Sequence, residues 1–302
     1  GDDRYVVDYL AEEVLRRQPP DVREFLLRTS LLDRLCGPLC DAVTERDDSR
    51  RLLESLEQAN LFLVPLDDKR RWYRYHHLFA DVLRAYLMDE QPGEVPGLHR
   101  RASAWHEQQG DLPSAIQHAF AAGDADRAAE LVERAVPAMG RSRQEETLLA
   151  WLDALPDEVI RARPVLCVDY AGTLLQARGD VARAETWLRH AERWLQPAHA
   201  TEAAPAGMRV ADDASFRRLP GQIAIYRAGQ ALIRGNVAGT MHHAGEALDA
   251  LPEHDDFGRG AAAGLLGLAL WTRGDLETGH RMYTECMARL ERAGFIFDLF
   301  GC

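Results

Sequence analysis

The sequence predicts a mainly α-helical chain in which a winged-helix domain with a small β-hairpin precedes a tetratricopeptide-like α-solenoid. Three observations support this fold class. Residues 19–92 contain short helices around a hairpin pattern, helical periodicity fills almost everything after residue 98, and Gly-Asp or Gly-Asn pairs recur between helices. The chain has 302 residues, 46% of them apolar and 28% charged, which is the composition of a globular protein with about two domains.

The first ninety residues carry the winged-helix pattern. The run "VREFLLRTSLL" predicts a helix after Asp21, a short segment follows from Pro38, and "RRLLESLEQAN" again has apolar residues at helical spacing. The runs "LFLVPL" and "RWYRY" flank the polar turn "DDKR", which is typical of a β-hairpin. The helix "HHLFADVLRAYLMDE" follows at once. Three helices, a hairpin and a closing helix make a winged helix, whose wing and core we expect to contain Trp72, Tyr73 and Tyr75.

The remaining two hundred residues show repeated helix pairs. Glycine can adopt the left-handed conformation that ends one helix, and Asp or Asn can accept hydrogen bonds from the first amides of the next. Gly179, Gly235 and Gly274 each precede Asp or Asn and are separated by 56 and 39 residues. Helix-pair solenoids have periods of about 34–47 residues. The longer gap contains the Ala/Pro-rich stretch 196–214, which predicts an exposed insertion.

Charge and cysteine content restrict the function. The formal net charge of −12 argues against nucleic-acid binding by this chain alone, although it leaves room for a local basic patch. Five scattered cysteines do not form a disulfide framework, which favours a reducing cytoplasm. No signal peptide is evident, and the longest apolar run is too short for a membrane span. The two ends have no terminal tails, so we expect a part of a longer protein.

The search for catalytic and metal motifs gives nothing of high specificity. GxxxxGK[ST], HExxH and GxSxG are all missing, so we expect no catalytic residue and no enzyme activity in this segment. Cys36 and Cys40 provide two of the four ligands that structural zinc needs, so we interpret them as small buried side chains. His242 and His243 lie in a predicted helix, where adjacent rings point about 100° apart. Solvated histidines are therefore expected there, and no metal site.

The run "FLLRTSLLDRLCGPLCDAV…LLESLEQANLFLVPLDDKRRWYRYHHLFADVLRAYL" resembles the large ATP-binding regulators of the LuxR family, of the MalT type, which belong to the STAND class of signal-transducing NTPases. The resemblance covers nearly the whole chain. It implies that residues 1–18 end an ATPase helical subdomain, 19–92 form the winged helix and 93–302 form the sensor. It also implies that the parent protein binds ATP or ADP, while this segment holds no cofactor. DNA would be bound only by a C-terminal domain that is missing here.

The resemblance assigns a role to His76. "YHHL", from Tyr75 to Leu78, fits the hydrophobic–His–x–Leu motif of STAND winged helices, whose histidine reaches the β-phosphate of bound ADP in the closed state. An imidazole can donate to a phosphate oxygen, and the helix N-terminus beside it favours anions. The alternative is that His76 caps the helix or forms hydrogen bonds within the hairpin. His77 is expected to face the hairpin or solvent.

The leading hypothesis is a regulatory and sensory segment of such a regulator. A small-molecule inducer or a regulatory protein would bind the concave face of the solenoid and shift the closed form toward an ATP-bound, self-associating form. Tetratricopeptide spacing puts these residues on that face: Asp169, Thr173, Gln176, Gln222 and Trp271. Each could instead be a solvated polar residue or, for Trp271, a core residue.

Two other functions stay open. The first is a protein-interaction scaffold without a small-molecule ligand, because solenoid faces often bind peptides or helices. The second is a self-contained DNA-binding winged helix. The net negative charge argues against DNA binding by the winged helix. So do the leucines of helix 50–59, because the core of the domain needs them.

Overall fold

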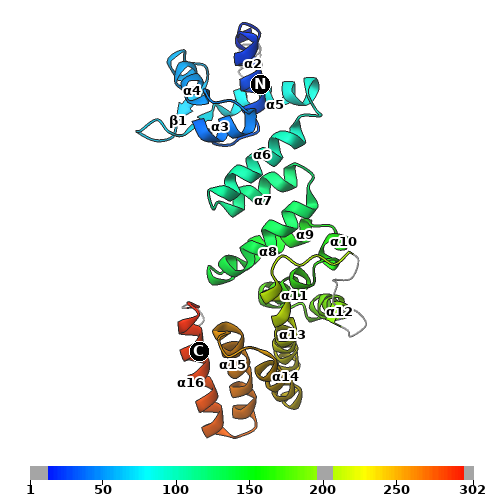
Figure 1. The fold of residues 1–302 in the computed structure, drawn as a ribbon. Helices are drawn as coiled ribbons and strands as arrows, with labels where there is room; N and C mark the ends of the chain where they lie inside the picture. The colour runs from blue at the N-terminus through cyan, green and yellow to red at the C-terminus, as the bar shows by residue number, and fades with distance from the viewer. Residues whose placement is uncertain (1–12, 196–206, 296–302) are drawn as a thin grey trace, which may run out of the picture. The chain divides into compact units, whose positions relative to one another are not determined.

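The computed structural model describes residues 13–195 and 207–295 (Figure 1). Contacts divide the chain into two compact units, residues 1–128 and 129–302, with the boundary inside helix α8 (Ala125–Arg141). Helices predominate in both units, and the described residues contain one two-stranded sheet. The predicted fold class, mainly α with a winged helix, a small hairpin and helical repeats, is confirmed. None of the described helices combines the length and apolar character needed to cross a membrane.

The winged helix occupies most of the first unit. Its elements follow the predicted order: α2 (Pro20–Thr29), α3 (Gly37–Thr44), α4 (Ser49–Gln58), β1 (Leu63–Pro65), β2 (Tyr73–Tyr75) and α5 (His77–Glu90). The strands are antiparallel, with Leu63 opposite Tyr75 and Pro65 opposite Tyr73. An isolated bridge between Leu35 and Tyr73 ties the hairpin to the segment between α2 and α3.

Alternation along β2 explains how the hairpin joins the core. Tyr73 and Tyr75 are buried, and Arg74 between them is exposed, as a period of two requires. The hydroxyl of Tyr75 lies 2.7 Å from Oγ1 of Thr29 in the interior. Trp72 is half-buried and meets Trp105 edge to face, with ring centroids 6.4 Å apart. The aromatic residues of the wing therefore pack in the core, as the sequence predicted.

The first helical hairpin also belongs to this unit. Helices α6 (Val95–Gln108) and α7 (Leu112–Ala121) pack against each other. Gly110 has a φ of +77° in the turn, and the carboxylate of Asp111 accepts a hydrogen bond from the amide of Ser114. This is the turn chemistry that the Gly-Asp pattern predicted.

The second unit consists of further helices: α9 (Glu145–Ala154), α10 (Asp157–Arg161), α11 (Pro164–Arg178), α12 (Val181–Leu195), α13 (Asp213–Ile233), α14 (Val237–Ala250), α15 (Asp256–Thr272) and α16 (Leu276–Arg292). Helices α11 and α12, α13 and α14, and α15 and α16 form successive pairs, and Figure 1 shows α15 beside α16. Gly179, Gly235 and Gly274 all have positive φ in the turns. Asn236 and Asp275 each cap the following helix with a side-chain oxygen.

Two predictions fall mainly on residues that are not described. Residues 1–12 hold most of the expected end of an ATPase helical subdomain, and residues 196–206 hold most of the expected insertion. Both ranges lie outside the described part of the chain.

Candidate ligand and nucleotide-sensing sites

His76 lies at the junction of the hairpin and α5. It is the N-cap residue of α5, its amide donates to the carbonyl of Phe62 at 2.7 Å, and its carbonyl accepts from the amide of Ala80 at 3.0 Å. Its side chain makes no capping hydrogen bond and is exposed, as is that of His77. The two imidazoles lie 4.4 Å apart, centroid to centroid. The backbone of His76 thus fixes the helix start, while its ring stays accessible at a helix N-terminus.

Three of the predicted ligand-binding residues lie on successive turns of α11. Asp169 is half-buried and Gln176 is exposed. Thr173 is 5% exposed, and its hydroxyl donates to the carbonyl of Asp169 at 2.8 Å. Because this bond uses the only hydroxyl proton of Thr173, a ligand could use only the lone pairs of that oxygen.

Asp169 belongs to a polar cluster that sequence reasoning did not find. Glu133 of α8 and Arg163 before α11 are both buried, with a carboxylate-to-guanidinium distance of 3.7 Å. Burial raises the pKa of Glu133 to about 6. Desolvation also raises the pKa of Asp169 to about 8, an effect that Glu133 strengthens and Arg218 of α13 opposes. Asp169 is therefore largely protonated at neutral pH and can donate a hydrogen bond.

A close approach of α11 and α13 places this cluster. A Cβ added to Gly172 would overlap the hydroxyl of Tyr226, so only glycine lets the Tyr226 ring lie on α11. The Tyr226 side chain is desolvated, and the nearby Asp169 carboxyl adds to the rise in the Tyr226 pKa. Gln222, one turn before Tyr226, is half-buried on the same helix. The structure thus places Gln222 on a helix that packs against the one carrying Asp169 and Thr173.

Trp271 lies elsewhere in the second unit. Its ring packs between α15 and α16, 4.8 Å from the ring of Tyr283, and a Cβ on Gly279 would overlap it. Such an environment fits the alternative that Trp271 is a core residue. A ligand-binding role for Trp271 stays a prediction. The sequence offered no signal for Glu133, Arg218 or Tyr226, because residues of three distant helices meet there.

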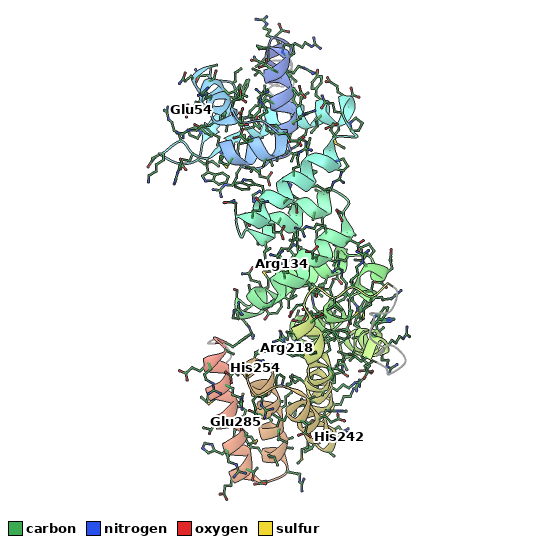
Figure 2. All side chains as sticks on the ribbon, viewed as in Figure 1. Glu54, Arg134, Arg218, His242, His254 and Glu285 are labelled. Atoms are coloured by element: carbon green, nitrogen blue, oxygen red, sulfur yellow. The ribbon has the colours of Figure 1, made fainter. Side chains whose placement is uncertain are left out.

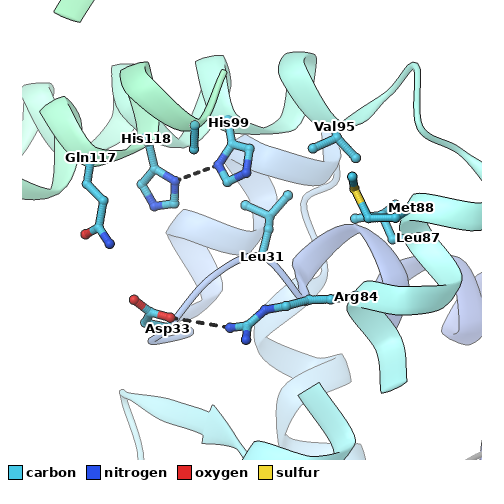
Figure 3. Close-up of a pocket in the computed structure, with 10 residues that line it drawn as sticks. Leu31, Asp33, Arg84, Leu87, Met88, Val95, His99, Gln117 and His118 are labelled. Atoms are coloured by element: carbon cyan, nitrogen blue, oxygen red, sulfur yellow. Dashed lines mark hydrogen bonds and ion pairs between the residues drawn. The ribbon is translucent and has the colours of Figure 1, made fainter. Parts of the chain in front are cut away.

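A second candidate site is a pocket of about 300 Å³ in the first unit (Figure 3). This volume is near the lower limit for small-molecule sites. Apolar side chains of α5 and α6 form part of its wall, together with Arg84, Asp33, Gln117 and two histidines. The Arg84 Nε donates to the carbonyl of Ser30 at 2.9 Å, and its Nη2 lies 3.4 Å from Oδ1 of Asp33. The guanidinium is thus already partnered within the pocket wall.

The histidines of this pocket form a connected group. Nδ1 of His99 and Nδ1 of His118 are 2.9 Å apart, which requires one hydrogen between them, so one ring donates and the other accepts (Figure 3). His106 stacks on His118 at 5.4 Å, and its Nδ1 lies 3.2 Å from Oδ2 of Asp111. Burial, aided by the two neighbouring histidines, lowers the pKa of His118 to about 4. These rings are therefore neutral at physiological pH.

Known proteins identify the architecture. Residues 11–95 match the model of the MalT winged helix domain. Over 287 residues, 94% of this chain, the sequence is 31% identical to the HTH-type transcriptional regulator MalT of Cronobacter sakazakii. The chain is MalT-like. It is also 40% identical over 191 residues to the serine/threonine-protein kinase PknK of Mycobacterium tuberculosis and Mycobacterium bovis, which covers 61% of the chain.

A solved structure shares the fold. The STAND protein with a tetratricopeptide repeat sensor from Pyrococcus horikoshii matches 95% of this chain and 47% of its own, with a TM-score of 0.59 and 16% identity. The predicted MalT-type resemblance is thus confirmed, with a winged helix followed by tetratricopeptide-like repeats. The MalT-like chain spans 30% of the Cronobacter MalT and 17% of the PknK kinases.

Because the histidine group of this MalT-like chain is neutral when folded, we expect the stability of the folded protein to fall in acid. The unfolded chain takes up a proton on His118 near pH 6.5, whereas the folded protein does so only near pH 4, so acid favours unfolding between these values. The free energy of unfolding of the parent chain should fall between pH 7.5 and pH 5. In His118→Gln this fall should be smaller by on the order of 1–3 kcal/mol. Urea unfolding at the two pH values measures the difference, and an identical loss in both proteins would contradict the assignment.

Proposed function

We propose that this chain is the regulatory and sensory part of an ATP-dependent LuxR-family transcription regulator that acts in the cytoplasm. The observation that carries the proposal is the pair of relatives. One is named as a transcription regulator and the other as a protein kinase, yet both contain a segment similar to this chain. Transcription regulation and protein phosphorylation are different activities. A segment that occurs in proteins of both kinds is expected to regulate the activity and not to perform it.

The winged helix would supply the nucleotide-sensing step. His76 has an accessible imidazole at the N-terminus of a 14-residue helix, where amide dipoles favour an anion. We assign it the contact with the β-phosphate of ADP in the closed form of the parent protein. Nucleotide hydrolysis and DNA binding would belong to other parts of that protein, and no catalytic step is assigned to the residues of this chain.

The solenoid would supply the sensor. Among the described residues around Asp169, the Nε of Arg218 has no hydrogen-bond partner, and the Oε2 of Glu133 forms no hydrogen bond, although it lies 3.7 Å from the guanidinium of Arg163. Buried polar atoms normally have partners. A polar small molecule between α11 and α13 could provide them, while Asp169, Gln222 and Gln176 fix its orientation. Binding would shift the closed form toward a self-associating form only by the difference in ligand affinity between the two forms.

A binding experiment on the full-length protein tests the sensor assignment. A metabolite panel is first screened by thermal stabilisation, and the compound that stabilises is then titrated by calorimetry. Asp169→Ala and Gln222→Ala should each weaken binding by roughly tenfold or more, because each removes a hydrogen bond to the ligand. Gln109→Ala in the first unit is the matched control and should bind as the parent does.

The scaffold alternative predicts a different result. It requires that no compound stabilises the protein, while a protein partner is captured and is lost on substitution of the α11 and α13 residues. Saturable binding that all the solenoid variants retain would place the inducer elsewhere and contradict the assigned face.

A further inference from the structure

Helix α14 carries a group of potential metal ligands that the proposed function does not use. His243 Nδ1 lies 2.8 Å from Oε2 of Glu246, and His242 Nε2 lies 3.4 Å from Oε1 of the same carboxylate. The centroids of the two imidazoles are 5.1 Å apart. His242 is exposed, as expected, but the two rings contact one carboxylate instead of pointing apart. Residues three and four positions before Glu246 lie on either side of it on the helix surface, so both rings can reach the carboxylate.

The geometry is close to that of a coordination sphere. One ligand atom from each of the three side chains lies within 4.8 Å of the others. Zinc binds histidine nitrogen at about 2.0–2.1 Å and carboxylate oxygen at about 2.0–2.2 Å, so ligands of one ion lie within roughly 4.2 Å of each other. Side-chain rotation would have to bring the three ligand atoms within this distance when an ion binds. His242, which Figure 2 labels, and Glu246 are exposed, and His243 is half-buried, so an ion can enter from solvent.

The donor set selects the class of ion. Two imidazole nitrogens and one carboxylate oxygen suit zinc, nickel or copper(II) better than magnesium or calcium, which prefer oxygen ligands alone. Within the described residues this is the one group in which three such side chains converge. The His99–His118 pair of the first unit brings only two nitrogens together.

We propose that His242, His243 and Glu246 form a surface site for a divalent transition-metal ion, with three protein ligands and the remaining positions open to water. The bound ion would cross-link one turn of α14.

Calorimetric titration of the metal-free full-length protein with Zn²⁺ at pH 7.5, in buffer without chelator, tests the proposal. We expect one saturable site attributable to α14, with at least tenfold weaker binding in His243→Ala and in Glu246→Gln. Cobalt(II) provides a second readout, since its visible absorption spectrum reports a nitrogen and oxygen ligand set.

The matched controls are His280→Ala and Glu277→Gln, which alter exposed residues of the same types on α16. They should bind Zn²⁺ as the parent does. Absence of saturable binding would overturn the proposal. So would unchanged affinity in the His242→Ala/His243→Ala double variant, since that result would assign the ion to other residues such as the His99–His118 pair. Circular dichroism of each variant checks that α14 remains folded.

Discussion

Replacing Phe79 by alanine is expected to lower the free energy of unfolding of the first unit by about 3–5 kcal/mol. The side chain of Phe79 is fully buried. Its ring lies 5.1 Å from that of Phe62 and 5.9 Å from that of Tyr75, which it meets edge to face. The substitution would therefore remove the contact between α5 and the hairpin and leave a cavity beneath the segment that begins at His76.

Chemical denaturation followed by circular dichroism measures this effect. Met88 lies on the same helix and is 57% exposed, so Met88→Ala is the control and should change stability by less than about 0.5 kcal/mol. A loss below about 1 kcal/mol for Phe79→Ala would show that α5 and the hairpin are not held together by this aromatic group.

Gly279→Val is expected to lower the free energy of unfolding by about 1–3 kcal/mol or more, because the added side chain would overpack the α15–α16 pair. A Cβ on Gly279 would overlap the Trp271 ring and lie 3.1 Å from the carbonyl oxygen of Gly267. The backbone atom cannot move aside as a flexible side chain can, so the two helices would have to separate.

Gly245→Ala is the matched control for this prediction. Gly245 lies inside α14, and a Cβ there would meet nothing within 4 Å. Alanine should therefore stabilise the helix by about 0.5–1 kcal/mol, because it restricts the unfolded chain. Thermal unfolding of both variants gives opposite shifts if close packing decides the outcome, and shifts in the same direction would contradict it.

The sequence was sufficient to predict most of the fold. Alternating aromatic residues predicted β2, and Gly-Asp or Gly-Asn pairs predicted the turns at Gly179, Gly235 and Gly274. These signals are local, since strand alternation and helix capping depend on residues within a few positions of each other. The structure confirms these local predictions because tertiary packing at these positions favours the same backbone conformations.

The candidate sites were harder to predict from the sequence than the fold. His99 and His118 are 19 residues apart on different helices, and Asp169 meets Glu133 and Arg218 only through the packing of α8, α11 and α13. Such groupings depend on helix register between repeats, which a single sequence does not specify. The contact of His242 and His243 with Glu246 escapes the sequence for a different reason: the angle between adjacent residues predicts divergent rings, but it does not take account of a shared neighbour three and four positions further on.

Nucleotide affinity of the full-length protein is the most direct test of the central claim, that the winged helix senses the nucleotide through His76. A charge-assisted hydrogen bond to phosphate contributes about 1.5–3 kcal/mol, so His76→Ala should raise the dissociation constant for ADP by roughly 10- to 100-fold. His77→Ala, which removes the adjacent exposed imidazole, should leave it unchanged. Equal ADP affinity in His76→Ala, His77→Ala and the parent protein would contradict the claim.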